Sequence, residues 1–242
     1  MEPAAYREML ALQETHWWFR ARRRILGALL GRFVPAGDRV LEVGAGTGAN
    51  LPLLAGWGAV TALEPDRFAA DHLLRTYDVE VVRGAVPAAP PEALGEFHLI
   101  AALDVLEHIE DEAGALAFIG GRLRPGGWLL ITVPAFGFLW SSHDDRLHHR
   151  RRYRLSELVA KVDAAGLAVA YGSYFNFLLF LPALAVRLAD RVRPGSAGSG
   201  AARTARPLDR ALGFVFGLET GFIGRVGLPF GLSIVVLARK PA

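Results

Sequence analysis

The sequence has no cysteine and only two lysines among its 27 basic residues. Because cysteine is absent, a disulfide framework and a thiolate zinc site are both excluded. No uncharged apolar run approaches the roughly 20 residues that a membrane-spanning helix needs. The first 18 residues carry charges where a signal peptide would have its apolar segment, so we expect a cytoplasmic chain that is not exported.

The composition that remains is globular, with an apolar bias. The 242 residues are 52% hydrophobic and 21% charged, with a net charge of +3. These values exclude global disorder, because disordered chains are poor in apolar residues and high in net charge. The mean hydropathy of +0.28 is high for a soluble enzyme, so membrane contact has to be considered. The arginine excess reflects either GC-rich coding or clusters of planar donors suited to phosphate and carboxylate.

Short apolar runs alternate with amphipathic segments along most of the chain. We expect helices over 4–33, from about 49, over 67–76, over 111–123 and from about 156 to 166. We expect strands over 39–43, 60–64, 79–83, 97–103, 128–133, 167–174 and 232–239. This alternation predicts an α/β fold with a doubly wound, Rossmann-like, mostly parallel sheet of seven strands.

The connection between the sixth and seventh strands is unusually long. Most such connections are a few residues long, but this one covers 176–231. Two apolar segments flank a Gly/Ser/Ala/Arg stretch at 195–207, which predicts two helices around a mobile linker. We therefore divide the chain into an N-terminal helical cap (1–37), a core domain (38–175 and 232–242) and an apolar helical insertion (176–231).

A glycine-rich turn follows the first strand. In VLEVGAGTGAN (40–50), Gly44, Gly46 and Gly48 permit positive φ and a close approach of the backbone to a ligand at a helix N-terminus. Glu64 ends the next strand, where its carboxylate can accept hydrogen bonds from ribose hydroxyls. Together they predict an adenosine-type cofactor. Gly44, Gly46 and Ala49 also fit the relaxed dinucleotide fingerprint.

Further features help to decide whether the adenosine-type cofactor is a dinucleotide or a cationic ligand without a pyrophosphate. Glu42, two residues before the turn, is a buried acid that suits a cationic ligand better than a pyrophosphate. LDVLEHIED (103–111) and LRPGGWLLITVP (123–134) follow, and the last two strands can pair as an antiparallel edge. With these motifs the chain resembles class I S-adenosylmethionine-dependent methyltransferases over roughly 38–175 and 232–239. A nicotinamide reductase of the Tyr-x-x-x-Lys type is excluded, because Glu157 and Val236 precede the two lysines by four residues.

The resemblance implies where S-adenosylmethionine and its product S-adenosylhomocysteine would bind. Glu42 and the glycine-turn backbone would hold the methionine moiety, Glu64 the ribose, residues 84–85 the adenine, and residues 103–105 the sulfonium side. Where the family often has an acid, this chain has Ala85, which implies adenine contacts through the backbone alone. The implied cofactor residues are Glu42, Gly44, Ala45, Gly46, Gly48, Asn50, Glu64, Pro65, Gly84, Ala85, Leu103, Asp104 and Val105.

Two segments, ETHWWFRARRR (14–24) and WSSHDDRLHHRRRYRLSEL (140–158), resemble a bacterial subgroup of these enzymes. An oxygen nucleophile must lose a proton, and imidazole is the usual base near neutral pH, so the catalytic candidates are His143, Asp144 and His149. The candidates for acceptor binding are Trp18, Phe19, Arg22, Arg151, Arg152 and Tyr153. As alternatives, the basic run is a solvated face and the aromatic residues are core packing. No metal ligand is assigned, although a divalent ion on His143, Asp144, His148 and His149 is a further alternative.

The functional prediction is a methyltransferase acting, at oxygen, on a small-molecule or lipid- or glycan-linked acceptor. A non-catalytic cofactor-binding partner of a membrane-associated biosynthetic complex is the alternative. A nucleic-acid methyltransferase is disfavoured because no N/D-P-P-Y/F motif occurs. An apolar segment (174–186) followed by Arg187, Arg191 and Arg193 predicts peripheral contact of 174–193 with anionic lipid on the inner face of the membrane. Packing as a lid or as a homodimer surface is the alternative for this segment.

Overall fold

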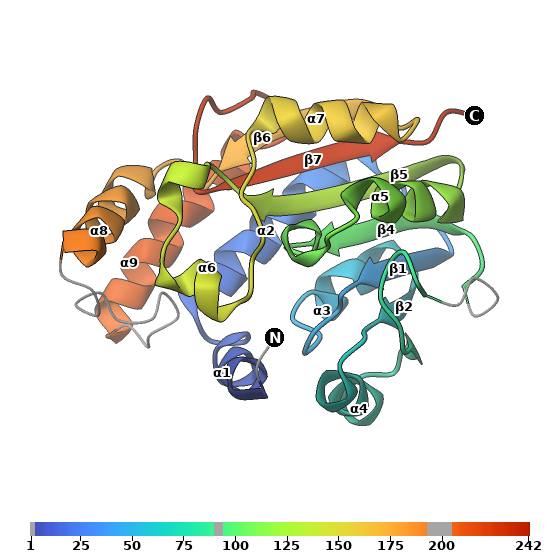
Figure 1. Cartoon of the computed structure of the whole chain (residues 1–242), viewed down its shortest axis with the longest axis horizontal. Coiled ribbons are helices and arrows are strands. Elements are labelled where there is room, and N and C mark those ends of the chain that lie inside the picture. The colour runs from blue at the N-terminus through green and yellow to red at the C-terminus, as the bar shows by residue number, and fades with distance from the viewer. Residues whose placement is uncertain (1–2, 90–93, 193–204) are drawn as a thin grey trace.

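A seven-stranded sheet runs through the molecule (Figure 1). The computed structural model describes residues 3–89, 94–192 and 205–242. The strand order is β3-β2-β1-β4-β5-β7-β6, with β7 antiparallel to both of its neighbours and the pairs from β3 to β5 all parallel. The strands are β1 (Arg39–Val43), β2 (Ala59–Leu63), β3 (Glu80–Val82), β4 (Phe97–Leu103), β5 (Leu123–Pro134), β6 (Ala168–Phe175) and β7 (Ser233–Arg239). The predicted fold class is confirmed.

Helices cover both faces of this sheet. They are α1 (Pro3–Leu12), α2 (Trp17–Phe33), α3 (Leu51–Leu54), α4 (Arg67–Thr76), α5 (Glu112–Arg122), α6 (Ser142–Arg146), α7 (Leu155–Ala164), α8 (Phe180–Val192) and α9 (Arg206–Gly217). Short 3-10 turns add η1 (Ala55–Trp57), η3 (Leu106–His108), η4 (Gly137–Leu139) and η5 (Leu218–Gly221).

Two hydrophobic cores follow from the alternation of side chains along the strands. In β1, Leu41 and Val43 point to the core shared with α5 and α7, whereas Val40 points to the core shared with α2, α4 and α9. Successive residues of a strand face opposite sides of the sheet, so a strand buried on both faces is apolar at nearly every position. This burial fixes the carboxyl ends of β1, β4 and β5, from which the site residues extend.

The expected helix over 4–33 is wrong in one respect, because the chain breaks into α1 and α2. His16 has extended backbone dihedrals, and its Nδ1 accepts a hydrogen bond from the Trp18 amide at 3.3 Å. Asp209 of α9 accepts the Trp17 amide at 3.0 Å and pairs with Arg20 at 3.1 Å. A carboxylate at a helix N-terminus satisfies an amide that has no partner within the helix. The break is therefore set by a residue distant in the sequence.

Other helix and strand boundaries differ by a few residues from those expected. The helix expected from about 49 lasts four residues (α3) before the 3-10 turn η1, and the fifth strand begins at Leu123 instead of 128. The insertion carries two helices, α8 and α9, which lie at the same end of the molecule in Figure 1. Most of the predicted linker, residues 195–204, lies outside the described residues. Among the residues described, no helix is both long and apolar enough to span a bilayer.

Candidate active site

The glycine turn adopts the left-handed backbone that its sequence suggests. Gly44, Gly46 and Gly48 have φ values of 65°, 55° and 86°. A Cβ on Gly44 would lie 2.8 Å from a methyl carbon of Val105, and one on Gly48 would lie 2.5 Å from the Tyr77 ring. Only glycine combines these torsions with this packing at low cost. The turn therefore lies directly against Val105 in the loop that follows β4.

Glu64 is buried at the end of β2, beside the glycine turn. Its Oε2 accepts the Gly46 amide at 2.7 Å, and its Oε1 accepts the Asp66 amide at 2.9 Å and the Tyr6 hydroxyl at 3.3 Å. Burial raises the pKa of Glu64, although these hydrogen bonds oppose that shift. Tyr6 belongs to α1, so the N-terminal helix lies over the carboxylate assigned to the ribose.

Glu42 is the buried acid of β1. It is 1% exposed, its Oε1 accepts the Asn50 amide group at 2.8 Å, and its Oε2 has no hydrogen-bond partner. Burial raises the pKa of Glu42 to about 8, with Asn50 and the charge of Arg22 acting in the opposite direction. A buried carboxyl with a free acceptor atom fits a cationic ligand such as the aminoacyl end of S-adenosylmethionine.

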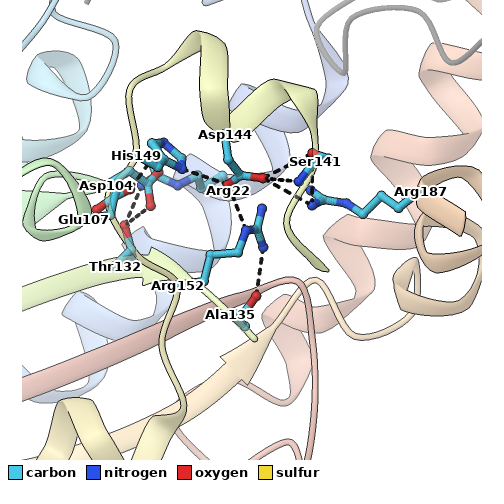
Figure 2. A network of polar contacts seen from close by, with 10 residues as sticks. All are labelled: Arg22, Asp104, Glu107, Thr132, Ala135, Ser141, Asp144, His149, Arg152 and Arg187. Carbon is cyan, nitrogen blue, oxygen red and sulfur yellow. Dashed lines mark hydrogen bonds and ion pairs between the residues drawn. The ribbon is translucent and has the colours of Figure 1, made fainter. Parts of the chain in front are cut away.

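Arg22 connects α2 to the ends of β4 and β5. Its Nη2 donates to Asp104 Oδ2 and to Thr132 Oγ1, both at 2.7 Å (Figure 2). Its Nη1 donates to Asn50 Oδ1 at 3.4 Å. Its guanidinium also lies 5.0 Å from the centre of the Trp18 ring. Arg22, predicted to bind the acceptor, thus contacts two residues assigned to the cofactor.

The remaining predicted cofactor residues lie around these groups. Leu103 and Ala45 are buried, Asp104 has a φ of 60°, and Gly84 donates to the Glu64 carbonyl at 3.4 Å. Pro65 and Ala85 are exposed. The roles of these residues in binding the cofactor stay predictions.

Asp144, on the one-turn helix α6, binds several residues of the segment 140–158. It is fully buried and accepts hydrogen bonds from Ser141 N at 2.9 Å, His149 Nδ1 at 2.9 Å and Arg152 Nε at 2.8 Å (Figure 2). Burial alone would raise the pKa of Asp144. The His149 hydrogen bond and the Arg152 guanidinium outweigh burial and hold that pKa well below its usual range.

The two candidate histidines differ. His149, not the adjacent His143, pairs with Asp144, because the chain turns back at His148 with a φ of 57°. His143 has a buried Nδ1 without a hydrogen-bond partner, and burial lowers its pKa to about 4. A carboxylate on Nδ1 leaves the other ring nitrogen of His149 available for chemistry. The geometry therefore favours His149 over His143.

The other predicted acceptor residues are engaged within the protein. Arg152 is 3% exposed at its side chain and also donates to the Ala135 carbonyl at 2.8 Å. Arg151 pairs with Glu112, which also accepts the Tyr153 hydroxyl at 2.6 Å. Trp18 and Phe19 contact each other edge to face, with ring centres 5.0 Å apart. Acceptor binding by these residues stays a prediction.

Two features of the site were not anticipated from the sequence. Glu107, on η3, is fully buried with no hydrogen bond to either carboxylate oxygen. Arg187 was expected to contact lipid, but it donates to the Leu139 carbonyl and lies 3.8 Å from Asp144. That expectation is wrong for Arg187, because the buried carboxylate and a free carbonyl attract the guanidinium inward. Glu107 stands next to His108 in the LEH run of η3, and this acid–histidine pair was the available signal.

Comparisons with known proteins show the family to which this chain is related. Residues 16–171 match a family described as a methyltransferase domain. A Mycolicibacterium smegmatis protein named "probable S-adenosylmethionine-dependent methyltransferase" is 29% identical over 67% of this chain and 64% of its own length. A ubiquinone biosynthesis O-methyltransferase of Thiobacillus denitrificans is 31% identical over 40% of this chain and 45% of its own. This chain thus matches less than two thirds of either relative.

The fold is shared with solved methyltransferase structures. A SAM-dependent methyltransferase from Archaeoglobus fulgidus superposes with a TM-score of 0.59 and 15% identity, over 90% of this chain and 94% of that one. At that identity the likeness shows the fold alone. The sequence match, in contrast, covers well over half of the chain, from α2 through β6. The chain therefore belongs to the methyltransferase domain family, whose cofactor is S-adenosylmethionine.

Proposed function

We propose that this protein transfers the methyl group of S-adenosylmethionine to an oxygen of a small-molecule or lipid-linked acceptor. The observation that carries the proposal is the His149–Asp144 pair, held beside the β4 loop at which the sulfonium is expected (Figure 2). The ubiquinone biosynthesis O-methyltransferases among the relatives support oxygen as the acceptor atom.

The reaction is an in-line displacement on an activated carbon. The acceptor oxygen forms a bond to the methyl carbon while the carbon–sulfur bond breaks, and S-adenosylhomocysteine leaves with the electron pair. The hydroxyl proton has to be removed, and His149 is the group placed to assist this step. The protein otherwise contributes orientation, which is worth effective molarities on the order of 10⁵ M or more.

His149→Ala is expected to lower turnover about 100-fold, the lower end of the usual contribution of general acid–base groups. The measurement is transfer of labelled methyl from S-adenosylmethionine to a panel of phenolic and polyprenyl alcohols, with a matching panel of amines. His72→Ala, which changes a half-buried histidine on α4 outside the candidate site, is the control. Full turnover by His149→Ala, or methylation of the amines alone, would contradict the proposal.

We also propose that the insertion contacts a membrane surface or the lipid part of the acceptor. Among the described residues, large apolar side chains with high exposure concentrate between 178 and 226. They are Leu178, Leu181, Val186, Leu188, Leu208, Phe214, Leu218, Phe222 and Val226. The exposed Arg206 and Arg210 lie on the same helix as Phe214, which favours anionic lipid.

Cosedimentation with vesicles tests this contact. Leu181→Glu and Phe214→Glu are each expected to weaken binding to phosphatidylglycerol vesicles about 10-fold or more, because a buried leucine or phenylalanine contributes roughly 1.5–3 kcal/mol. Leu74→Glu, an equally exposed apolar position on α4, is the matched control. Unchanged sedimentation of both variants, or a dimer that both substitutions dissociate, would contradict a membrane role.

A further inference from the structure

Glu107 is a buried acid whose carboxylate oxygens have no hydrogen-bond partner. Its side chain is 0% exposed, and neither carboxylate oxygen accepts a hydrogen bond. Leaving a buried polar group unpaired is costly, and for a carboxylate the cost is large unless a cation balances it. Folding alone gives no reason for such a group in a short turn. The carboxylate therefore calls for a positively charged partner.

Two imidazoles surround this carboxylate. His149 Nε2 lies 4.0 Å from Glu107 Oε1, and the His108 and His149 rings have centres 4.8 Å apart. One ligand atom from each of Glu107, His108 and His149 lies within 4.8 Å of the other two. The ion site considered from the sequence included His149, but its other members, His143, Asp144 and His148, are not the residues that gather here.

Each of the two histidine rings, His108 and His149, also makes a hydrogen bond within the protein. His149 Nδ1 donates to Asp144 at 2.9 Å, which leaves Nε2 with its lone pair toward Glu107. The His108 ring donates a hydrogen bond to the backbone carbonyl of His148. The Arg150 amide donates to the Glu107 carbonyl at 2.8 Å and ties the two segments together. A carboxylate or carbonyl behind each imidazole is the usual support of a metal-binding histidine.

We propose that Glu107, His108 and His149 bind one divalent cation. Two imidazole nitrogens and one carboxylate favour a first-row transition ion such as Mn²⁺, Co²⁺ or Zn²⁺ over Mg²⁺ or Ca²⁺. Bonds of about 2.0–2.2 Å would draw the ligand atoms in to roughly 3–3.5 Å from one another. Small side-chain rotations supply that movement.

The ion's role rests on the proposed function and deepens it. Asp104, whose side chain is 32% exposed, lies beside Glu107 and follows β4, where the sulfonium is expected (Figure 2). A hydroxyl bound to the ion would lose its proton to water more readily. With the ion present, that effect would replace the direct proton removal proposed above for His149, and His149 would serve as a ligand. With three protein ligands, free coordination positions remain for the acceptor.

The test is a titration of the chelator-treated protein with Co²⁺, followed by d–d absorption and calorimetry. We expect one ion per chain, and an affinity at least about 10-fold weaker in Glu107→Gln and in His108→Asn. His148→Asn is the control, because this exposed neighbour keeps its backbone carbonyl and its positive φ. If Glu107→Gln fails to fold by circular dichroism, His108→Asn carries the same test.

Absence of saturable binding, or unchanged affinity in Glu107→Gln and His108→Asn, would overturn the inference. Its failure is separable from failure of the proposed function. If the enzyme methylates a phenol equally well after chelation, the proposed function stands and the role of the ion in it is contradicted. A protein that binds Co²⁺ through these ligands but methylates no oxygen acceptor keeps the ion site and loses the proposed activity.

Discussion

Glu64→Ala is expected to remove most of the affinity for S-adenosylmethionine and S-adenosylhomocysteine. A carboxylate that accepts two ribose hydroxyls makes two charge-assisted hydrogen bonds, each worth about 1.5–3 kcal/mol. Their loss corresponds to roughly 10²- to 10⁴-fold weaker binding. Glu64 already accepts two backbone amides at the turn, so the carboxylate is oriented before the cofactor arrives.

Thermal unfolding measures this directly without knowledge of the acceptor. S-adenosylhomocysteine at about 100 times its Kd should stabilise the wild-type protein by roughly 2.7 kcal/mol. For a chain of this size, that is a Tm increase of about 5–10 °C. Glu64→Ala should show almost no increase, and Glu64→Gln a small one, at the same ligand concentration. Glu80→Ala, which removes an acid of β3 bonded to Thr61, is the control. A full shift in Glu64→Ala would refute the ribose assignment.

The fold could be predicted from the sequence because the features that indicate it are local. Buried strands such as β4 are apolar at nearly every position, and the torsions of Gly44, Gly46 and Gly48 can be expected from residue type alone. The spacing from the turn to Glu64 follows from one strand–helix–strand unit. These features need no knowledge of distant residues, so the expectations for them are close to the structure.

The site depends on contacts between distant parts of the chain, which a single sequence does not reveal. Asp209 sets the start of α2, and Arg187 turns toward Asp144 instead of toward lipid. The choice of His149 over His143 depends on the reversal at His148. The sequence nominated Asp144 and both histidines, but only the folded chain shows which pair meets.

Asp144→Ala is expected to destabilise the protein by about 3–5 kcal/mol, the usual cost of removing one partner of a buried ion pair. Arg152, 3% exposed, would keep its charge with only the Ala135 carbonyl as an acceptor. A change of this size lowers Tm by roughly 6–20 °C. Asp145→Ala is the matched control. Asp145 is the exposed neighbour of Asp144, and its side chain accepts a hydrogen bond from the Trp140 indole at 2.9 Å.

The dependence on pH separates the Asp144 charge from simple loss of packing. The folded protein holds the pKa of Asp144 below its ordinary value of 3.8. Its contribution to stability is therefore present above about pH 4 and is lost as the pH falls below that value. The stability difference between wild type and Asp144→Ala, measured by urea unfolding, should shrink below pH 4. Combining Asp144→Ala with Arg152→Leu should cost less than the sum of the two single changes, because the double variant does not leave the Arg152 charge buried without its carboxylate. A pH-independent difference with additive single changes would show that Asp144 acts through packing instead of charge.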